Sequence, residues 1–117
     1  MLSLSEYQNV ISEEFSNLHI HKQPKNLYEP IDYILSLGGK RIRPVLCSLA
    51  CGMSGGDISL AKDAAIAVEM LHNFTLIHDD IMDNADTRRG KPSVFKKWDS
   101  NTAILSGDVL FTLALEQ

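Results

Sequence analysis

The sequence predicts an all-α fold. Apolar residues recur at spacings of three and four along most of the 117 residues, and no convincing strand alternation or hairpin dipeptide lies between the apolar runs. Hydrophobic residues make up 44% of the chain, which is ordinary for a globular protein with a packed core. A bundle of helices without long flexible linkers is therefore expected.

Local signals place five helices in order along the chain. Ser3 and Glu6 have the spacing of a capping box, which starts a helix, and Pro30 fits a second helix only in its first turn. Pro44 suits the first turn of a third helix, and Ser59 is the expected N-cap of a long fourth helix. The expected helices span about 4–18, 27–37, 44–54, 60–84 and 100 onward; the expected loops include 19–24 and 87–92.

Composition limits the classes of partner. Eleven basic and fifteen acidic side chains give a net charge of -4, so no global basic field is available to attract nucleic acid. The first ten residues lack the positive head and apolar block of a secretory signal, and no apolar run approaches the roughly 18 residues of a membrane span. The sequence therefore favours a cytoplasmic protein with no nucleic-acid partner and no membrane span.

An acidic cluster ends the expected fourth helix. Asp79 and Asp83 are four residues apart, so their carboxylates project from the same helix face. Like charges at this spacing cost a helix a few tenths of a kcal/mol, so another interaction must favour them. Mg²⁺ takes one or two protein carboxylates and completes its shell with water and phosphate oxygens. The pair therefore indicates a magnesium site for a substrate that carries phosphate.

Basic residues lie close to these acids or in a second cluster. Arg88 and Arg89 follow the acidic helix, and the planar guanidinium group of arginine matches phosphate oxygens. In the segment GGKRIRP, Lys40, Arg41 and Arg43 follow two glycines that permit a sharp turn. Acids that bind metal and bases that bind phosphate, together in one small chain, indicate a diphosphate substrate.

Each motif also has an ordinary structural interpretation. Acids followed by arginines are commonly a solvated surface with weak ion pairs, and Gly-Gly-Lys-Arg is commonly a turn between helices. Two alternative functions follow. One is a metal-dependent phosphohydrolase that uses His72, His78, Asp79 and a later aspartate, and tight transition-metal binding would favour it. The other is a non-catalytic helical fragment that oligomerises through exposed apolar faces.

Taken together, the motifs resemble the N-terminal third of trans-isoprenyl (polyprenyl) diphosphate synthases of the short-chain type. GGKRIRP, HNFTLIHDDIMD and DTRRGKPS occur in the family's order and spacing, and AILSGDVLF is similar to the family's next helix. The resemblance begins at about Leu27. It implies an isoprenoid-synthase helical bundle, of which residues 1–117 form the N-terminal part of one domain, and it implies a homodimer.

The resemblance implies a Mg²⁺-dependent prenyltransferase that joins isopentenyl diphosphate to an allylic diphosphate (dimethylallyl, geranyl or farnesyl) by head-to-tail 1'-4 condensation. By resemblance, Asp79 and Asp83 bind Mg²⁺ bridged to the allylic diphosphate, and Asp80 assists. Arg88 would contact the same diphosphate. The residues that would bind isopentenyl diphosphate are Lys40, Arg43, His72 and Arg89, with Arg41 as an additional helper.

Residues just before the first aspartate motif control product length in this family. Here these residues are Phe74 and Thr75, and the Phe74 ring would form the cavity floor, which implies geranylgeranyl or farnesyl diphosphate as product. The alternative is that Phe74 is a plain core residue.

The sequence departs from the family pattern at two points. The family's second aspartate-rich motif is absent, and GDVLFTLALEQ ends inside a helical apolar pattern without a capping residue. We therefore expect a truncated chain that is catalytically inactive alone. Phe95 stands where many relatives carry histidine, which puts in doubt any role of this loop beyond Arg88 and Arg89.

Overall fold

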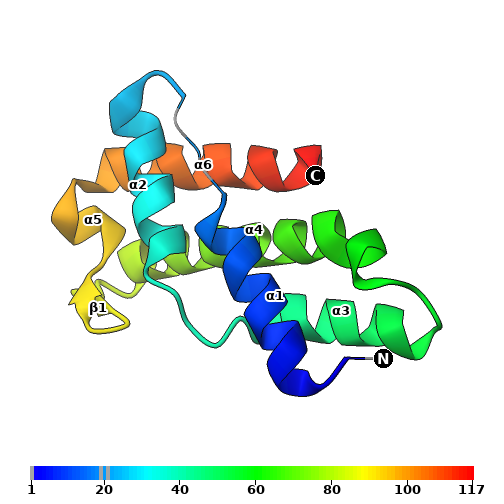
Figure 1. Ribbon diagram of the computed structural model, residues 1–117. Helices are drawn as coiled ribbons and strands as arrows, with labels where there is room; N and C mark the ends of the chain where they lie inside the picture. Colours follow the sequence, from blue (N-terminus) through cyan, green and yellow to red (C-terminus); the bar gives the residue numbers. More distant parts are fainter. Residues whose placement is uncertain (1, 19, 21) are drawn as a thin grey trace.

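Six α-helices and one very short β-hairpin make up the regular structure of the described residues in the computed structural model (Figure 1). The structure describes residues 2–18, 20 and 22–117, so residues 19 and 21 of the expected loop at 19–24 lie outside it. The predicted all-α fold is confirmed. The elements are α1 (Leu4–Ser16), α2 (Lys25–Ser36), α3 (Ile42–Met53), α4 (Ile58–Met82), β1 (Thr87–Arg88), β2 (Lys91–Pro92), α5 (Val94–Lys97) and α6 (Ser100–Glu116).

The capping box at the start of α1 is confirmed. The Ser3 hydroxyl accepts a hydrogen bond from the Glu6 backbone N–H at 3.3 Å, and the Glu6 carboxylate accepts one from the Ser3 N–H at 2.6 Å. The two bonds satisfy donors that a helix start otherwise leaves without partners. The helix then buries Tyr7 and Ile11 against α3 and α4.

The second helix corrects the expectation for Pro30. Because Pro24 occupies the N-cap in extended conformation, α2 already begins at Lys25, and Pro30 lies in its second turn rather than its first. A proline there removes the hydrogen bond to the carbonyl of Asn26. Asn26 is exposed, so water can reach that part of the helix start. The Pro30 ring itself is buried.

The long helix α4 is the central element of the bundle (Figure 1). Its 25 residues match the expected length. Its N-cap is Asp57 instead of the expected Ser59, because the Asp57 carboxylate accepts the Ser59 N–H at 2.9 Å. It packs against α3 on one side and α6 on another. Its last helical residue is Met82, and Asp83 forms the C-cap.

The expected loop at 87–92 is a small antiparallel hairpin, which the sequence analysis missed. Thr87 pairs with Pro92 and Arg88 with Lys91. Arg89 and Gly90 between them have φ angles of 53° and 77°. Positive φ at both central residues is the mark of a type I′ turn, which matches the twist of paired strands. The four-residue helix α5 that follows was also not predicted.

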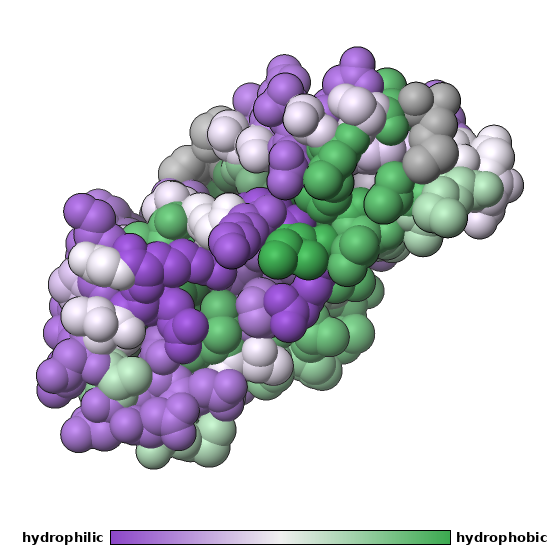
Figure 2. Space-filling view, turned by 90° about the horizontal axis from the view of Figure 1, so that it is seen from below, coloured by the Kyte–Doolittle hydropathy of each residue, from purple (hydrophilic) through white to green (hydrophobic). Residues whose placement is uncertain are grey.

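The main core lies between α2, α4 and α6. Ile31 and Ile34 of α2, Met70 and Ile77 of α4 and Leu110 of α6 are almost completely buried there. Large apolar side chains also remain exposed on α3, α4 and α6, and Figure 2 shows hydrophobic residues beside strongly hydrophilic ones on one face of the molecule. Within the described residues, no helix is both long and apolar enough to cross a bilayer.

Candidate active site

Two other segments of the chain contact the second half of α4. The loop of residues 38–43 contacts α4 through Arg43 and His72. The hairpin contacts α4 through Arg88 and Asp80. The folded chain thus brings together the two basic clusters and the acidic cluster that the sequence analysis singled out.

The loop of residues 38–43 has an unusual backbone. Gly38, Gly39 and Arg41 have φ angles of 78°, 115° and 52°, all in the region that side chains disfavour. Arg41 forms the N-cap of α3, so the chain turns sharply and enters the helix at once. This turn leaves Lys40 and Arg43 exposed at the start of α3.

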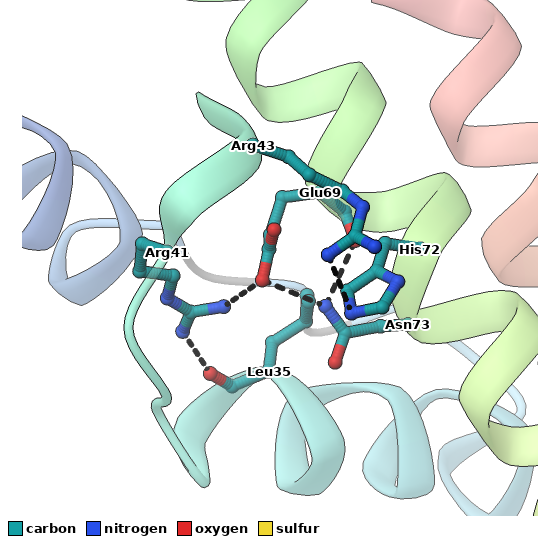
Figure 3. A network of polar contacts seen from close by, with 6 residues as sticks. All are labelled: Leu35, Arg41, Arg43, Glu69, His72 and Asn73. Carbon is teal, nitrogen blue, oxygen red and sulfur yellow. Dashed lines mark hydrogen bonds and ion pairs between the residues drawn. The ribbon is translucent and has the colours of Figure 1, made fainter. Parts of the chain in front are cut away.

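Arg41 points inward rather than toward solvent (Figure 3). Its guanidinium donates to the Glu69 carboxylate at 3.1 Å and to the Leu35 carbonyl at 2.5 Å, and it lies over the Phe15 ring, 4.2 Å from the centroid. The residue is 9% exposed. The expected helper for isopentenyl diphosphate is therefore engaged within the protein.

Glu69 and Asn73 complete this network, and sequence reasoning missed both. Glu69 is 3% exposed, and it accepts a second hydrogen bond from the Asn73 amide at 3.3 Å. Asn73 is fully buried and also donates to the Glu69 carbonyl at 2.8 Å. A charged residue amid the apolar positions of a predicted core helix was the available signal, because a buried carboxylate needs a cationic partner.

His72 lies beside this network, closer to the surface. Arg43 donates a hydrogen bond to the His72 Nε2 atom at 3.2 Å (Figure 3). Because arginine can only donate, Nε2 accepts and carries no proton. Burial, and then the positive charge of Arg43, hold the pKa of His72 below its ordinary value of 6.5. A half-buried neutral histidine beside an arginine is suited to share an incoming anion with it.

Arg89 reaches back to the loop of residues 38–43. A Cβ added to Gly39 would lie only 2.9–3.1 Å from the Arg89 guanidinium group, so a side chain at this position would collide with it. Burial, and then the nearby charge of Arg41, lower the pKa of Arg89. In the described part of the chain, Lys40, Arg43 and Arg89 form no ion pair with an acid. They form a cationic surface beside His72.

The aspartates divide into an outward pair and an inward member. Asp79 and Asp83 are exposed and one turn apart, since the Asp83 N–H donates to the Asp79 carbonyl at 2.8 Å. Asp80 is 2% exposed and accepts two hydrogen bonds from Arg88, at 2.6 and 3.2 Å. Hydrogen bonding to Asp80 and its charge raise the pKa of Arg88 against the opposing effect of burial.

The outward pair fits Mg²⁺ by its donor chemistry. Asp79 and Asp83 offer oxygen ligands only, and Mg²⁺ commonly uses one or two carboxylates together with water and phosphate. The described residues contain no group of three or more acidic, histidine or cysteine side chains that could form a closed metal site. Asp80, the expected assistant, instead binds Arg88.

Phe74 lies between α4 and α6. Its ring centroid is 5.1 Å from that of Phe111 and 4.7 Å from that of His78. Thr75 is exposed and its hydroxyl donates to the His72 carbonyl at 2.6 Å. The aromatic partner Phe111, on a helix 37 positions further along the chain, could not be inferred from local sequence.

The two histidines of the phosphohydrolase alternative have different partners. His72 contacts Arg43. His78 lies with Nε2 3.2 Å from the Ile104 carbonyl and 3.6 Å from the Asp108 carboxylate. No group of metal ligands that contains these residues with Asp79 occurs in the described part, so no observation favours that function.

Comparison with known proteins shows the family. Residues 24–117 match the model of a family described as polyprenyl synthetase. The chain belongs to the polyprenyl synthetase family. The resemblance drawn from the motifs is thereby confirmed.

Similar proteins in the polyprenyl synthetase family carry related names. The chain is 51% identical over 96 residues to geranylgeranyl pyrophosphate synthase 9, chloroplastic, of Arabidopsis thaliana, covering 80% of this chain and 27% of that protein. It is 49% identical over 94 residues to the geranylgeranyl diphosphate synthase of Methanosarcina mazei, covering 80% and 29%. The chain therefore spans less than a third of the length of these two relatives.

Solved structures of the family agree in fold. A crystal structure of a geranylgeranyl pyrophosphate synthase superimposes with a TM-score of 0.94 at 49% identity, covering 99% of this chain and 36% of that one. The geranylgeranyl pyrophosphate synthetase of Pyrococcus horikoshii gives a TM-score of 0.87 at 41% identity, covering 97% and 36%. The helices described here therefore have the arrangement of this family.

Proposed function

We propose that this chain forms part of a single-domain prenyltransferase of isoprenoid biosynthesis, which joins isopentenyl diphosphate to an allylic diphosphate by head-to-tail 1'-4 condensation. The observation that carries the proposal is the meeting of an exposed aspartate pair and a cluster of cations along one stretch of α4. The reaction has two diphosphate substrates, and the aspartate pair and the cation cluster could each bind one of them. The names of the similar proteins support the same class of reaction.

The cationic surface is the proposed site for the diphosphate of isopentenyl diphosphate. Its members are Lys40, Arg43 and Arg89, and the neutral His72 beside them would also contact the anion. The arginine forks can each donate two hydrogen bonds to phosphate oxygens. Burial, and then the positive charge of Arg43, keep the pKa of His72 low in the absence of the anion, and a bound diphosphate would offset that charge.

The outward aspartates are the proposed site for the allylic diphosphate. Asp79 and Asp83 would hold Mg²⁺, which would supply positive charge to the phosphate oxygens. Arg88 would approach the same diphosphate while Asp80 orients its guanidinium group, because their paired hydrogen bonds fix its plane.

The proposed chemistry needs stabilisation of charge and no covalent nucleophile. The allylic C–O bond breaks and its electron pair leaves with the diphosphate, where Arg88 stabilises the growing negative charge. The double bond of isopentenyl diphosphate, held through Arg43 and Arg89, attacks the allylic cation and forms the new C–C bond. Loss of a proton from the former isopentenyl unit then gives the product, and exclusion of water protects the cation.

Phe74 is the proposed floor for the growing chain. Its contact with Phe111 of α6 forms an aromatic barrier, and a rigid barrier slightly deeper than Asp79 favours geranylgeranyl or farnesyl diphosphate as product. Thr75 points to the exposed surface, so we propose that it has the smaller influence on product length.

The proposed enzyme is a homodimer, and the 117-residue chain alone is inactive. Exposed apolar side chains of α6, such as Leu105 at 56% exposure and Leu115 at 71%, offer a surface for a second copy. Inactivity is proposed because the described metal ligands form an open pair, which would hold the departing diphosphate incompletely.

Isothermal titration with a thio-substituted geranyl diphosphate, which does not ionise readily, tests the proposal. Binding that requires Mg²⁺, is lost in Asp79→Ala and is kept in Asp63→Ala would support it. Asp63 is the matched control, because it is an exposed aspartate near the other end of α4. A folded chain that binds neither this ligand nor inorganic diphosphate would contradict the proposal.

A further inference from the structure

We propose that Glu69 is a positioning residue for the proposed isopentenyl diphosphate site. Its buried ion pair with Arg41 holds the loop of residues 38–43 against α4, and thereby keeps Arg43 beside His72. This inference rests on the proposed function, because it names what places the phosphate-binding cations. Glu69 does not itself touch the ligand and acts through Arg41.

The loop needs such a fixed point because of its backbone. Three of its six residues have positive φ angles, and one of them, Arg41, is not glycine. A side chain in the left-handed region is strained and persists only where the surrounding contacts determine it. Lys40 lies between two of these residues, so its direction depends on the same turn.

Arg41 receives those contacts from three sides, and only one of them is charged. Its guanidinium bonds the Leu35 carbonyl, covers the Phe15 ring and pairs with Glu69. The side chains of the ion pair are only 8% and 4% exposed. A buried guanidinium without its carboxylate would be an uncompensated charge, so loss of Glu69 favours withdrawal of Arg41 toward solvent.

Two adjacent contacts connect the start of α3 with α4 (Figure 3). Arg41 and Arg43 are two residues apart, and their partners Glu69 and His72 are three apart on one helix. The inner contact is buried, and the outer one is at the surface. Since Arg43 follows Arg41 within the same turn, movement of the inner arginine displaces the outer one from His72.

A purely electrostatic role of Glu69 predicts the opposite result. Glu69 lies close enough to Arg89 and His72 for its negative charge to influence the pKa of each of them. Removing this charge would by itself strengthen the attraction of the cationic surface for an anion. A positioning role predicts weaker anion binding after the same change, so the sign of the effect separates the two.

The first test is titration of the folded 117-residue chain with inorganic diphosphate at low ionic strength. We expect Glu69→Gln to weaken binding by about tenfold, the effect of losing one charge-assisted hydrogen bond to the anion. Glu13→Gln is the matched control, because it makes the same charge change on the exposed side of α1; it should bind like the parent chain. Binding by folded Glu69→Gln that equals or exceeds that of the parent chain would overturn the proposal.

The second test keeps the charge and uses no ligand. In Glu69→Asp the carboxylate is one methylene shorter, and we expect the pKa of His72, followed by NMR of the ring protons, to rise as Arg43 moves away. The charged groups that act on His72 are Arg43, Glu69, Arg89 and Arg88. An unchanged pKa in a folded variant would contradict positioning.

This second test also separates the two proposals. If the parent chain does not bind diphosphate, the proposed function fails, whereas the His72 titration still decides the role of Glu69. If Glu69→Asp does not fold, Arg41→Lys replaces it, because this variant keeps both charges of the buried pair. The pKa of His72 should rise in that variant too, because an ammonium group cannot bond both Glu69 and the Leu35 carbonyl with the geometry of the guanidinium and so holds the loop less firmly, and an unchanged value would again contradict positioning.

Discussion

Arg88 grips Asp80 with two parallel hydrogen bonds, Nη2 to Oδ1 at 2.6 Å and Nε to Oδ2 at 3.2 Å. This pair joins the hairpin to α4, and it turns the middle aspartate of the acidic cluster into the protein. The adjacent Asp79 remains exposed. Asp79 and Asp80 therefore have different environments, so the same substitution at each of them can be compared.

Asp80→Asn should destabilise the chain by about 2 kcal/mol, because it removes the charge from a buried acceptor and leaves Arg88 without its anion. Urea unfolding measures the change. Asp79→Asn should change the free energy of unfolding by less than about 0.5 kcal/mol, because that side chain is exposed. Equal effects of the two substitutions would contradict the structural role of the Arg88 pair.

The stability of the chain should depend on the protonation of His72. Burial and Arg43 lower its folded-state pKa below 6.5, so near and below that pH the unfolded chain binds the proton more readily. The free energy of unfolding therefore rises as pH increases through this window. His72→Gln should remove this contribution, so its stability relative to the parent chain should be greater at pH 5.5 than at pH 8. If the free energies of unfolding of His72→Gln and the parent chain, measured by urea titration, changed with pH in parallel, His72 would not be the source of the pH dependence.

Gly39→Ala should affect both stability and diphosphate binding. Its φ of 115° disfavours any side chain, at a cost of about 1–3 kcal/mol, and the new Cβ would displace the Arg89 guanidinium. Gly38→Ala is the control, because it has a similar backbone strain at φ 78° but nothing within 4 Å of the added Cβ. Gly39→Ala and Gly38→Ala should both lower the thermal unfolding temperature. In diphosphate titrations, Gly39→Ala should weaken binding much more than Gly38→Ala does. Equal loss of binding in both variants would show that Arg89 does not matter.

Gly107 of α6 should be required only because of His78. An added Cβ would lie 2.6 Å from the His78 Nε2 atom, so Gly107→Ala should destabilise the chain by about 1–3 kcal/mol. With His78 also changed to alanine, the clash disappears. The same glycine substitution should then stabilise the helix by roughly 1 kcal/mol, through the better helix propensity of alanine. A double-mutant cycle measured by urea unfolding would show this change of sign.

Local sequence patterns predicted the helices well because their causes are local. The Ser3 capping box and the unbroken apolar pattern of α4 each depend on residues within a few positions of one another. Errors occurred where two local signals competed, as at Asp57 and Ser59, where the earlier residue caps the helix. The hairpin was missed because Arg89 occupies a turn position that glycine or asparagine more often fills.

The site was predicted only in part, because its pairings are tertiary. Sequence spacing sufficed to place Asp79 and Asp83 on one face. It gave no means to assign Arg41 to the interior and Arg43 to the surface, since that choice depends on the buried Glu69 28 residues further along. The Phe111 contact with Phe74 likewise depends on how α6 packs against α4.

The unbroken helix α4 sets the spacing between the two halves of the proposed site. His72 and Asp79 are seven residues apart, which corresponds to about 10 Å along the axis and nearly two full turns. Deletion of one residue between them would shorten this spacing by about 1.5 Å and rotate one half relative to the other by about 100°. The helix thus fixes both the distance between the two halves of the site and the direction in which each half faces. The number of residues between His72 and Asp79 is therefore a constraint of its own, separate from what each side chain there contributes to packing.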